Sequence, residues 1–472
     1  MADERDKIEM SLGRSLSRRQ FLKTAGIAGA AVGAAAGLGG LLAACGEDTT
    51  PTSDVTGGTA TGETDTTVVS TSAESGGEIK CGYVIPVTGA MAAFGAAGQW
   101  QLDWFNKNTW KDGVVCGDGK KYKITTKIYD SQSDSNRSSQ VTSDAILNDG
   151  VTLIGASSSA ANVIPVAAMA DSLECPGIHY DVPGDAWAEA QQKAGGAYKY
   201  NWCTWWVGKD LVDNFVKMWS LVPTNKVVGA LWVNDADGMV FANALPGLFK
   251  ELGYTLVDPG RFEVGTEDFS AVISQFKREG VELVCGMANP AEFSNYVKQC
   301  SQQFFRPKIT TCAKALLFPT GVDALGDLGD GMTAEAWYSP DYKYKSDVTG
   351  MTAKQYCDDY EATTGQQWTS PICFIGTFEL WTDVLRRTKN PLDKASVIEA
   401  IKGTKVTLTG GPVDWTVNPE PKFNIPNFYP KPLAGGQWIK ATEGRFKYKK
   451  ELVVSAQDPT NIPITAEMKA MA

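Results

Sequence analysis

The stretch between Val151 and Asp181 places the strongest local constraint on the fold of this chain. It opens with a short apolar run that is long enough for one buried strand, followed by a turn of small residues with three consecutive serines. Apolar residues then recur at helical spacing, and a second buried run ends at Asp181. A strand, a hydroxyl-rich turn and a helix leave free backbone N–H groups beside hydroxyl donors, which predicts a site for a carboxylate or similar anion. The alternative is a helix capped by a serine with nothing bound.

The same alternation of buried strands and amphipathic helices occurs twice along the chain. Strands are predicted at 81–87, 122–130, 226–233, 254–257 and 281–285, and helices at 138–147, 211–221, 241–252, 269–276 and 293–300. Such series predict an α/β fold with two doubly wound parallel-sheet lobes. In folds of this kind, ligands bind at the carboxyl ends of the strands, so we expect a cleft between the lobes.

The first 44 residues indicate export. Arg18 and Arg19 precede a small-residue apolar run, as in a twin-arginine signal peptide, and Leu42-Ala43-Ala44-Cys45 resembles a bacterial lipobox. We expect Cys45 to be lipidated and to anchor an extracytoplasmic protein to the membrane; the many glycines and alanines argue against the alternative, a transmembrane helix. Residues 45–77 are a polar, low-complexity segment, which predicts a disordered tether.

The composition narrows the classes of function. A net charge of −10 without basic runs argues against nucleic-acid binding. Nucleotide-binding, zinc and calcium motifs are absent from the sequence, so we expect no cofactor and no metal. His179 is the single histidine, and there is no Gly-x-Ser-x-Gly sequence. We therefore expect no enzyme; the alternative, a hydrolase using Ser158 and His179, lacks an obvious orienting group.

Nine cysteines remain besides Cys45, and none are spaced as Cys-x-x-Cys, which argues against a zinc or thioredoxin-like site. An exported protein can form disulfides. The candidate pairs that lie near each other in the sequence are Cys81/Cys116, Cys300/Cys312 and Cys357/Cys373. The connectivity stays open.

Several short stretches carry a resemblance to a known family. They are Val84-Ile85-Pro86-Val87-Thr88-Gly89 with Ala93-Phe94-Gly95, Asp130-Ser131-Gln132-Ser133-Asp134, Gly265-Thr266-Glu267-Asp268-Phe269-Ser270, and Gly411-Pro412-Val413-Asp414-Trp415. In their order and spacing they resemble the branched-chain amino-acid-binding family of ABC-transporter solute receptors. The resemblance implies a type I periplasmic-binding-protein fold, in which two lobes joined by three crossovers close on a small ligand. It also implies an ABC permease as partner.

The resemblance further implies a division of the chain. The first lobe would comprise residues 78–202 and 313–408, and the second lobe residues 203–312 and 409–472. The crossovers would lie near Asn201–Trp205, Thr311–Lys314 and Leu408–Gly411.

A set of ligand contacts is implied as well. In the family the hydroxyl-rich loop and the loop after the next strand hold the ligand carboxylate, an aromatic residue packs on the ligand, and the second lobe adds aromatic and polar side chains. The candidate residues here are Phe94, Ser157, Ser158, Ser159, His179, Tyr180, Asp181, Trp205, Asp237, Asn289, Glu292 and Trp337. For each of them the alternative is a packing or surface role.

The chain departs from the family pattern at positions that decide the ligand's charge. Asp181 stands in a loop that would hold a carboxylate, which it repels unless it meets an amine or is itself neutralised. Asp237 stands where an aromatic residue is common, and Ala291 replaces an acidic residue, with Glu292 one position later. We expect an amino acid with an apolar or aromatic side chain, with an aromatic carboxylate as runner-up. A ligand-sensing lipoprotein without a transporter is a further alternative.

Overall fold

The computed structural model describes residues 73–455 and 457–471. The predicted signal peptide, the predicted lipidation site Cys45 and the predicted tether up to residue 72 lie outside the described residues. The first strand begins at Ser75, so the last residues assigned to the tether belong to the folded body. Within the described ranges, no helix is both long enough and apolar enough to cross a membrane.

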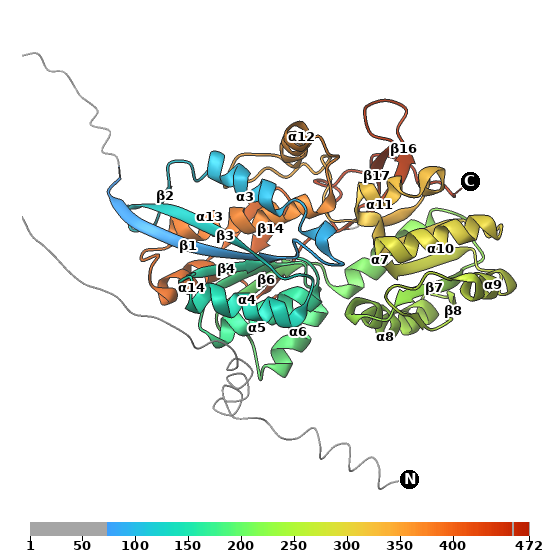
Figure 1. Ribbon diagram of the computed structural model, residues 1–472, viewed down its shortest axis with the longest axis horizontal. Coiled ribbons are helices and arrows are strands. Elements are labelled where there is room, and N and C mark those ends of the chain that lie inside the picture. Colours follow the sequence, from blue (N-terminus) through green and yellow to red (C-terminus); the bar gives the residue numbers. More distant parts are fainter. Residues whose placement is uncertain (1–72, 456, 472) are drawn as a thin grey trace, which may run out of the picture. The chain divides into compact units, whose positions relative to one another are not determined.

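The first lobe is built on one sheet with the strand order β15-β6-β5-β4-β1-β3-β2, of which Figure 1 labels β1, β2, β3, β4 and β6. Neighbouring strands are parallel, except that β2 runs antiparallel to β3. The strands are β1 (Ser75–Ile85), β2 (Val114–Val115), β3 (Lys121–Asp130), β4 (Leu153–Ala156), β5 (Gly177–Tyr180), β6 (Asn201–Trp205) and β15 (Phe428–Pro430). The helices of this lobe are η1 (Ala92–Phe94), α3 (Gly98–Lys107), α4 (Ser135–Leu147), α5 (Ala160–Ser172), α6 (Gly184–Lys193), α12 (Ala353–Thr364), η4 (Ser370–Ile375), α13 (Gly376–Arg387) and α14 (Lys394–Lys402). A small hairpin, β13 (Lys405–Leu408) and β14 (Gly411–Asp414), completes it.

The second lobe has the strand order β17-β16-β12-β11-β10-β7-β8, with β9 also paired to β7. Its strands are β7 (Val227–Val233), β8 (Thr255–Val257), β9 (Arg261–Phe262), β10 (Leu283–Ala288), β11 (Ile309–Lys314), β12 (Thr333–Ala336), β16 (Ala434–Lys440) and β17 (Tyr448–Ser455). Its helices are α7 (Gly208–Ser220), α8 (Ala236–Glu251), α9 (Ser270–Arg278), α10 (Pro290–Gln302), η2 (Ala315–Leu317), α11 (Pro319–Asp323) and η3 (Gly326–Gly329). The predicted α/β class with two doubly wound lobes is confirmed.

Both sheets are covered on two faces. Every residue of β4, β5, β6, β10 and β11 is buried, as expected for parallel strands with helices on both sides. Local signals in the sequence set where the helices begin. The Asp134 carboxylate accepts a hydrogen bond from the Arg137 N–H at the start of α4, and Asp235 accepts one from the Gly238 N–H at the start of α8.

The chain crosses between the lobes after β6, after β12 and after β15. The first crossing directly follows the expected segment Asn201–Trp205. The second and third lie later than expected, because Thr311–Lys314 belongs to β11 inside the second sheet and Leu408–Gly411 forms the β13–β14 turn. Residues 313–336 therefore lie in the second lobe, and residues 409–430 lie with the first.

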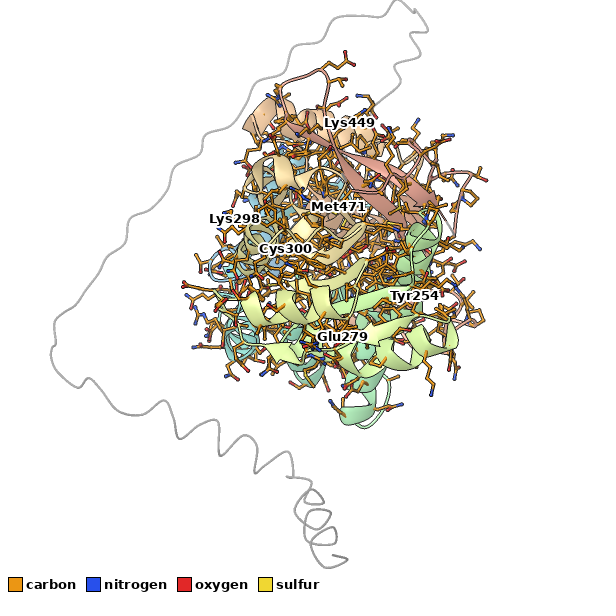
Figure 2. All side chains as sticks on the ribbon, turned by 90° about the vertical axis from the view of Figure 1, so that its right-hand side faces the viewer. Tyr254, Glu279, Lys298, Cys300, Lys449 and Met471 are labelled. Atoms are coloured by element: carbon orange, nitrogen blue, oxygen red, sulfur yellow. The ribbon has the colours of Figure 1, made fainter. Side chains whose placement is uncertain are left out.

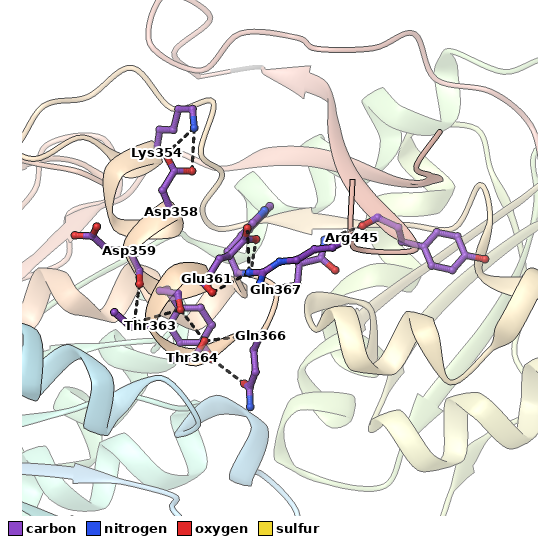
Figure 3. A network of polar contacts seen from close by, with 12 residues as sticks. Lys354, Asp358, Asp359, Glu361, Thr363, Thr364, Gln366, Gln367 and Arg445 are labelled. Carbon is purple, nitrogen blue, oxygen red and sulfur yellow. Dashed lines mark hydrogen bonds and ion pairs between the residues drawn. The ribbon is translucent and has the colours of Figure 1, made fainter. Parts of the chain in front are cut away.

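Contacts between α12 and the β16–β17 hairpin connect the two lobes at one side (Figure 3). The Arg445 guanidinium donates a hydrogen bond to the Glu361 carbonyl at 2.8 Å, and the Gln367 amide donates one to the Tyr448 carbonyl at 2.7 Å. Helix α12 is itself fixed to α3, because the Trp100 indole donates a hydrogen bond to it.

The nine cysteines in the described part of the chain are all free and buried. The candidate pairs Cys81/Cys116, Cys300/Cys312 and Cys357/Cys373 are therefore wrong as disulfides. Cys300, which lies on α10 in the second lobe (Figure 2), is an example of these buried thiols. Burial raises the pKa of its thiol to about 12, so it packs as a small apolar group and is poorly reactive.

Candidate ligand-binding site

Loops from both lobes meet at a small cavity of about 40 Å³. Each of these loops follows the carboxyl end of a parallel strand, where ligands bind in α/β folds. The polar and aromatic side chains that line the cavity are Phe94, Ser159, Asp181, Trp206, Asp237, Lys314, Glu335 and Trp337. Leu211 and Met287 supply apolar surface.

The backbone is strained where several of these loops turn. Ser158, Ser159, Asp181 and Lys314 have φ angles of 96°, 65°, 66° and 63°. Residues other than glycine rarely adopt positive φ, and such strain gathers at functional sites. The loops therefore hold a specific geometry that the surrounding fold enforces.

The serine turn at the start of α5 is largely engaged within the protein. The hydroxyls of Ser157 and Tyr83 share a hydrogen bond of 2.8 Å. The Ser159 N–H donates to the Asp181 carboxylate at 2.9 Å. The buried Ser158 hydroxyl has no hydrogen-bond partner among the described residues. The position predicted for a ligand carboxylate is thus occupied at Ser159 by a carboxylate of the protein itself.

Asp181 is almost fully buried, at 4% exposure. Burial raises the pKa of its carboxyl well above the usual value, and the Ser159 N–H opposes this change. The negative charges of Asp237 and Glu335 raise the pKa further. Asp181 therefore needs a positive partner in order to ionise in this site.

Lys314 forms the charged floor of the cavity. Its ammonium lies 2.8 Å from Asp235 and 2.7 Å from Asp237, with its side chain only 7% exposed. Burial lowers the pKa of Lys314, but the two carboxylates more than reverse this effect, so its pKa ends above the usual value. The single ammonium is therefore committed to two carboxylates.

Aromatic rings form the opposite wall. The Phe94 and Trp337 rings lie 5.8 Å apart, and Trp205 packs edge-on against Trp337 from behind at 4.9 Å. The buried Lys431 ammonium donates a hydrogen bond to the Trp337 carbonyl at 2.7 Å and lies over the Trp205 ring. These contacts hold Trp337 in place.

The structure brings together five of the twelve residues predicted from the sequence. Those that line the cavity are Phe94, Ser159, Asp181, Asp237 and Trp337. Those that do not line it are Ser157, Ser158, His179, Tyr180, Trp205, Asn289 and Glu292.

Two of the residues outside the cavity have internal roles. A ring nitrogen of His179 lies 2.8 Å from the Asn201 side-chain oxygen, and burial lowers the pKa of this histidine to about 4. Glu292 accepts a hydrogen bond from the Gly265 N–H at 2.8 Å, so it fixes a loop of the second lobe. In the part of the chain described here, His179 is paired with Asn201 and shares no hydrogen bond with Ser158, so the structure does not form the pair that the hydrolase alternative uses.

Three of the polar and aromatic residues that line the cavity were not predicted. Trp206 follows β6 directly, so the tryptophan after the strand, rather than Trp205 within it, faces the cavity. Lys314 ends β11 and Glu335 lies in β12. Charged residues within buried strands are the signal that could have identified the latter two, because a buried charge requires a partner.

An outer groove of about 850 Å³ joins the cavity. It runs between α5 and α6 of the first lobe and α7 and α8 of the second, and its lining is mainly apolar. The residues that border both spaces are Ala160, Pro183, Trp206, Leu211, Asp237 and Met287. The cavity therefore has a mainly apolar entrance between the lobes, with one carboxylate at its border.

Within the stretches that the structure covers, no group of three or more His, Cys, Asp or Glu side chains is arranged to hold a metal ion. The geometry offers carboxylates, aromatic rings and apolar surface for binding an organic molecule.

Comparison with known proteins gives a consistent family and fold. The family model for periplasmic binding proteins matches residues 78–423. The leucine-binding protein LivK from Thermotoga maritima has a similar fold, with a TM-score of 0.62 and 17% identity over 80% of this chain and 99% of that one. The isoleucine-bound LivJ from Streptococcus pneumoniae has a TM-score of 0.60 and 16% identity over 79% and 99%. A solute-binding protein from Rhodopseudomonas palustris in complex with 4-hydroxybenzoate has a TM-score of 0.63 and 16% identity over 81% and 98%.

Proposed function

From the membership of this chain in the periplasmic-binding-protein family, we propose that it is a receptor for a small organic molecule. The receptor is anchored by lipid, captures the molecule between its two lobes and delivers it to an ABC permease. The predicted family and the type I fold are confirmed. Members of the family bind solutes outside the cytoplasm and are not enzymes.

One observation carries the proposal. A cavity lined by carboxylates and aromatic rings lies at the junction of loops from both lobes, and the first crossing brings Trp206 into its wall. A molecule bound there contacts both lobes at once. It stabilises the closed arrangement through contacts that only this arrangement makes.

The side chains of the cavity favour a ligand that brings an amine. Asp181 and Glu335 are buried carboxyl groups whose pKa values burial raises, so each is ionised more readily beside a positive partner. An amine supplies that partner, whereas a ligand carboxylate would add a third acidic group without water. An amino acid is thus favoured over an aromatic carboxylate. The comparisons do not decide between them, because proteins of this fold have been seen with isoleucine and with 4-hydroxybenzoate.

Anchoring through Cys45 supports the same role. A receptor that must meet a permease gains from being held at the membrane, and the low-complexity segment between Cys45 and β1 would, as a flexible coil, give roughly 30 Å of reach.

The test is a thermal-shift screen against amino acids, amines and small carboxylates, followed by small-angle scattering with each binder. A ligand that binds only the native state raises the melting temperature. We expect at least one binder, and a smaller radius of gyration in its presence. A binder that leaves the radius of gyration unchanged, or that is recovered chemically altered, would contradict capture between the lobes.

A further inference from the structure

The charge of the ligand follows from how the cavity's own charges are paired. The Ser159 N–H, which stands at the N-terminus of α5, already donates to Asp181 at 2.9 Å. This donor is therefore not free for a ligand carboxylate. The protein supplies its own carboxyl group at this position, and Asp181 lines the cavity.

The remaining charges of the cavity point the same way. Its charged lining consists of Asp181, Asp237, Glu335 and Lys314. Lys314 is held by Asp237 and by Asp235 behind it. An entering anion therefore meets no uncommitted ammonium in the described lining, whereas an entering cation meets Asp181 and Glu335.

Two nearby lysines offset part of this negative charge from behind the wall. Burial raises the pKa of Glu335 and the positive charge of Lys450 opposes this, while burial lowers the pKa of Lys431 and the negative charge of Asp181 opposes that. The Lys431 ammonium donates to the Trp337 carbonyl at 2.7 Å, and the Lys450 ammonium donates to the Glu335 carbonyl at 2.7 Å. Neither lysine lines the cavity. Both stand behind its wall, where they support the backbone that carries Trp337 and Glu335.

Two of the side chains that line the cavity, Glu335 and Trp206, carry buried polar atoms without partners in the described ranges. Glu335 is 1% exposed, and its Oε2 atom accepts no hydrogen bond from any residue in the described ranges. Trp206 is 7% exposed, and its indole N–H likewise lacks a partner in that part of the chain. A buried acceptor left unpaired is destabilising, and an ammonium group would satisfy it.

The aromatic wall suits a cation for a separate reason. Phe94, Trp206 and Trp337 line the cavity together with the carboxylates. Aromatic faces attract organic ammonium ions through their quadrupoles, and the attraction is strongest where water is excluded.

The sizes of the two spaces indicate the rest of the ligand. A cavity of about 40 Å³ holds little more than one head group, since a water molecule in the liquid takes about 30 Å³. The body of a larger ligand must extend into the outer groove of about 850 Å³, whose lining includes Ile164, Leu211 and Phe241.

We propose that the ligand is an organic ammonium ion without a required carboxylate, with its head group against Asp181 and Glu335 and its apolar body in the groove between α5, α6, α7 and α8. This inference rests on the proposed receptor function and narrows its ligand class. It replaces the amino-acid carboxylate expected at the serine turn with Asp181 of the protein itself.

Calorimetry on the full mature chain with matched triads of compounds tests the assignment. Each triad keeps one hydrocarbon body and changes the head group: 3-methylbutylamine, 4-methylpentanoate and leucine; 2-phenylethylamine, 3-phenylpropanoate and phenylalanine; tryptamine, 3-indolepropanoate and tryptophan. We expect an amine to bind more tightly than its acid and its amino acid. The assignment is overturned if no amine binds, or if the acid or the amino acid is the tightest binder in every triad.

Two variants at position 181 sharpen the result. Asp181→Asn keeps an oxygen for the Ser159 N–H, so the turn stays folded, and it should weaken amine binding about 10- to 100-fold through loss of a charged partner. Asp181→Gly suits the φ of 66° and frees the Ser159 N–H, so it should gain affinity for the acids. Unchanged amine affinity in both variants would refute the role of Asp181.

The outcomes separate this inference from the proposed function. If the acid or the amino acid is the tightest binder in every triad and the lobes close on it, the ammonium assignment is wrong and the receptor function is still supported. If no compound binds and a metabolite extract produces no closure, the receptor function falls as well.

Discussion

Replacing Lys314 by Met tests the charged floor of the cavity. The ammonium is 7% exposed and joins Asp235 and Asp237, whose side chains are 27% and 19% exposed. Removing one partner of a buried ion pair destabilises a protein by about 3–5 kcal/mol, because the remaining charge is left unpaired. Both carboxylates keep some contact with water, and Asp235 keeps its hydrogen bond from Gly238, so we expect a loss of about 2–3 kcal/mol.

Urea denaturation at pH 7 measures this loss, and an exposed ion pair provides the control. Lys354 pairs with Asp358 on the surface of α12, with side chains 66% and 57% exposed (Figure 3). Lys354→Met should lower the free energy of unfolding by less than about 1 kcal/mol. An equal or smaller loss in Lys314→Met would refute the view that Lys314 neutralises the two carboxylates.

The pH dependence of stability gives a second readout for Lys314. Its pKa is raised above the usual value of 10.5, so its contribution is fully present below pH 10.5 and is lost as the pH rises through the folded-state pKa. The Met variant should lack this alkaline decline. A wild-type profile as flat as that of the variant would speak against the raised pKa.

Three further predictions concern other parts of the chain. Burial raises the pKa of Glu379 from 4.5 to about 7, so it contributes stability below pH 4.5 that is lost as the pH rises through about 7. The free energy of unfolding of Glu379→Gln should therefore rise relative to that of the wild type by about 3 kcal/mol between pH 4.5 and pH 8. A difference in urea denaturation that stays constant over this pH range would contradict the prediction. In Gly95→Ala the new methyl group would lie 2.1 Å from the Pro86 carbonyl oxygen, so the free energy of unfolding should fall by about 1–3 kcal/mol. The same change should displace Phe94 and weaken ligand affinity in calorimetry. Wild-type values for both measurements would contradict the prediction. Cys45→Ala should leave the protein uncleaved or released into the medium, and fractionation that finds it membrane-bound at the mature mass would disprove lipid anchoring.

The sequence predicted the sheets and helices well where periodicity and burial agree. The apolar residues spaced as in a helix around Leu211–Leu221 and Phe293–Cys300 correspond to α7 and α10. Such spacing places the apolar side chains on one face of a helix, and that face packs against the sheet. The start of β1 was missed, since residues 75–80 are largely exposed and polar. Strand propensity is weak without a buried face.

The course of the chain between the lobes was harder to predict. Thr311 looked like part of a crossover, but its hydroxyl lies 2.6 Å from that of Thr333 and accepts a hydrogen bond from the Trp219 indole. Polar residues that satisfy one another can lie in the core of a sheet, and a single sequence does not show which partners they find.

The site was only partly predictable for a related reason. Aromatic residues and carboxylates in loops after strands were good candidates, and Asp181 and Trp337 lie at the cavity. His179 and Glu292 were equally plausible by type, yet both are bound internally. Whether a polar side chain meets a ligand or another residue depends on its tertiary partners, which no local pattern specifies.

The central claim is that a small solute is held between the lobes against Trp206 and Asp181. The most direct test is to equilibrate the purified protein with a metabolite extract, wash it, denature it and identify the retained molecules by mass spectrometry. The same experiment is run with Trp206→Ala, whose side chain borders both the cavity and the groove. We predict that the wild type retains a chemically unaltered amine and that the variant loses it. Retention of the same molecules by both proteins would contradict the account.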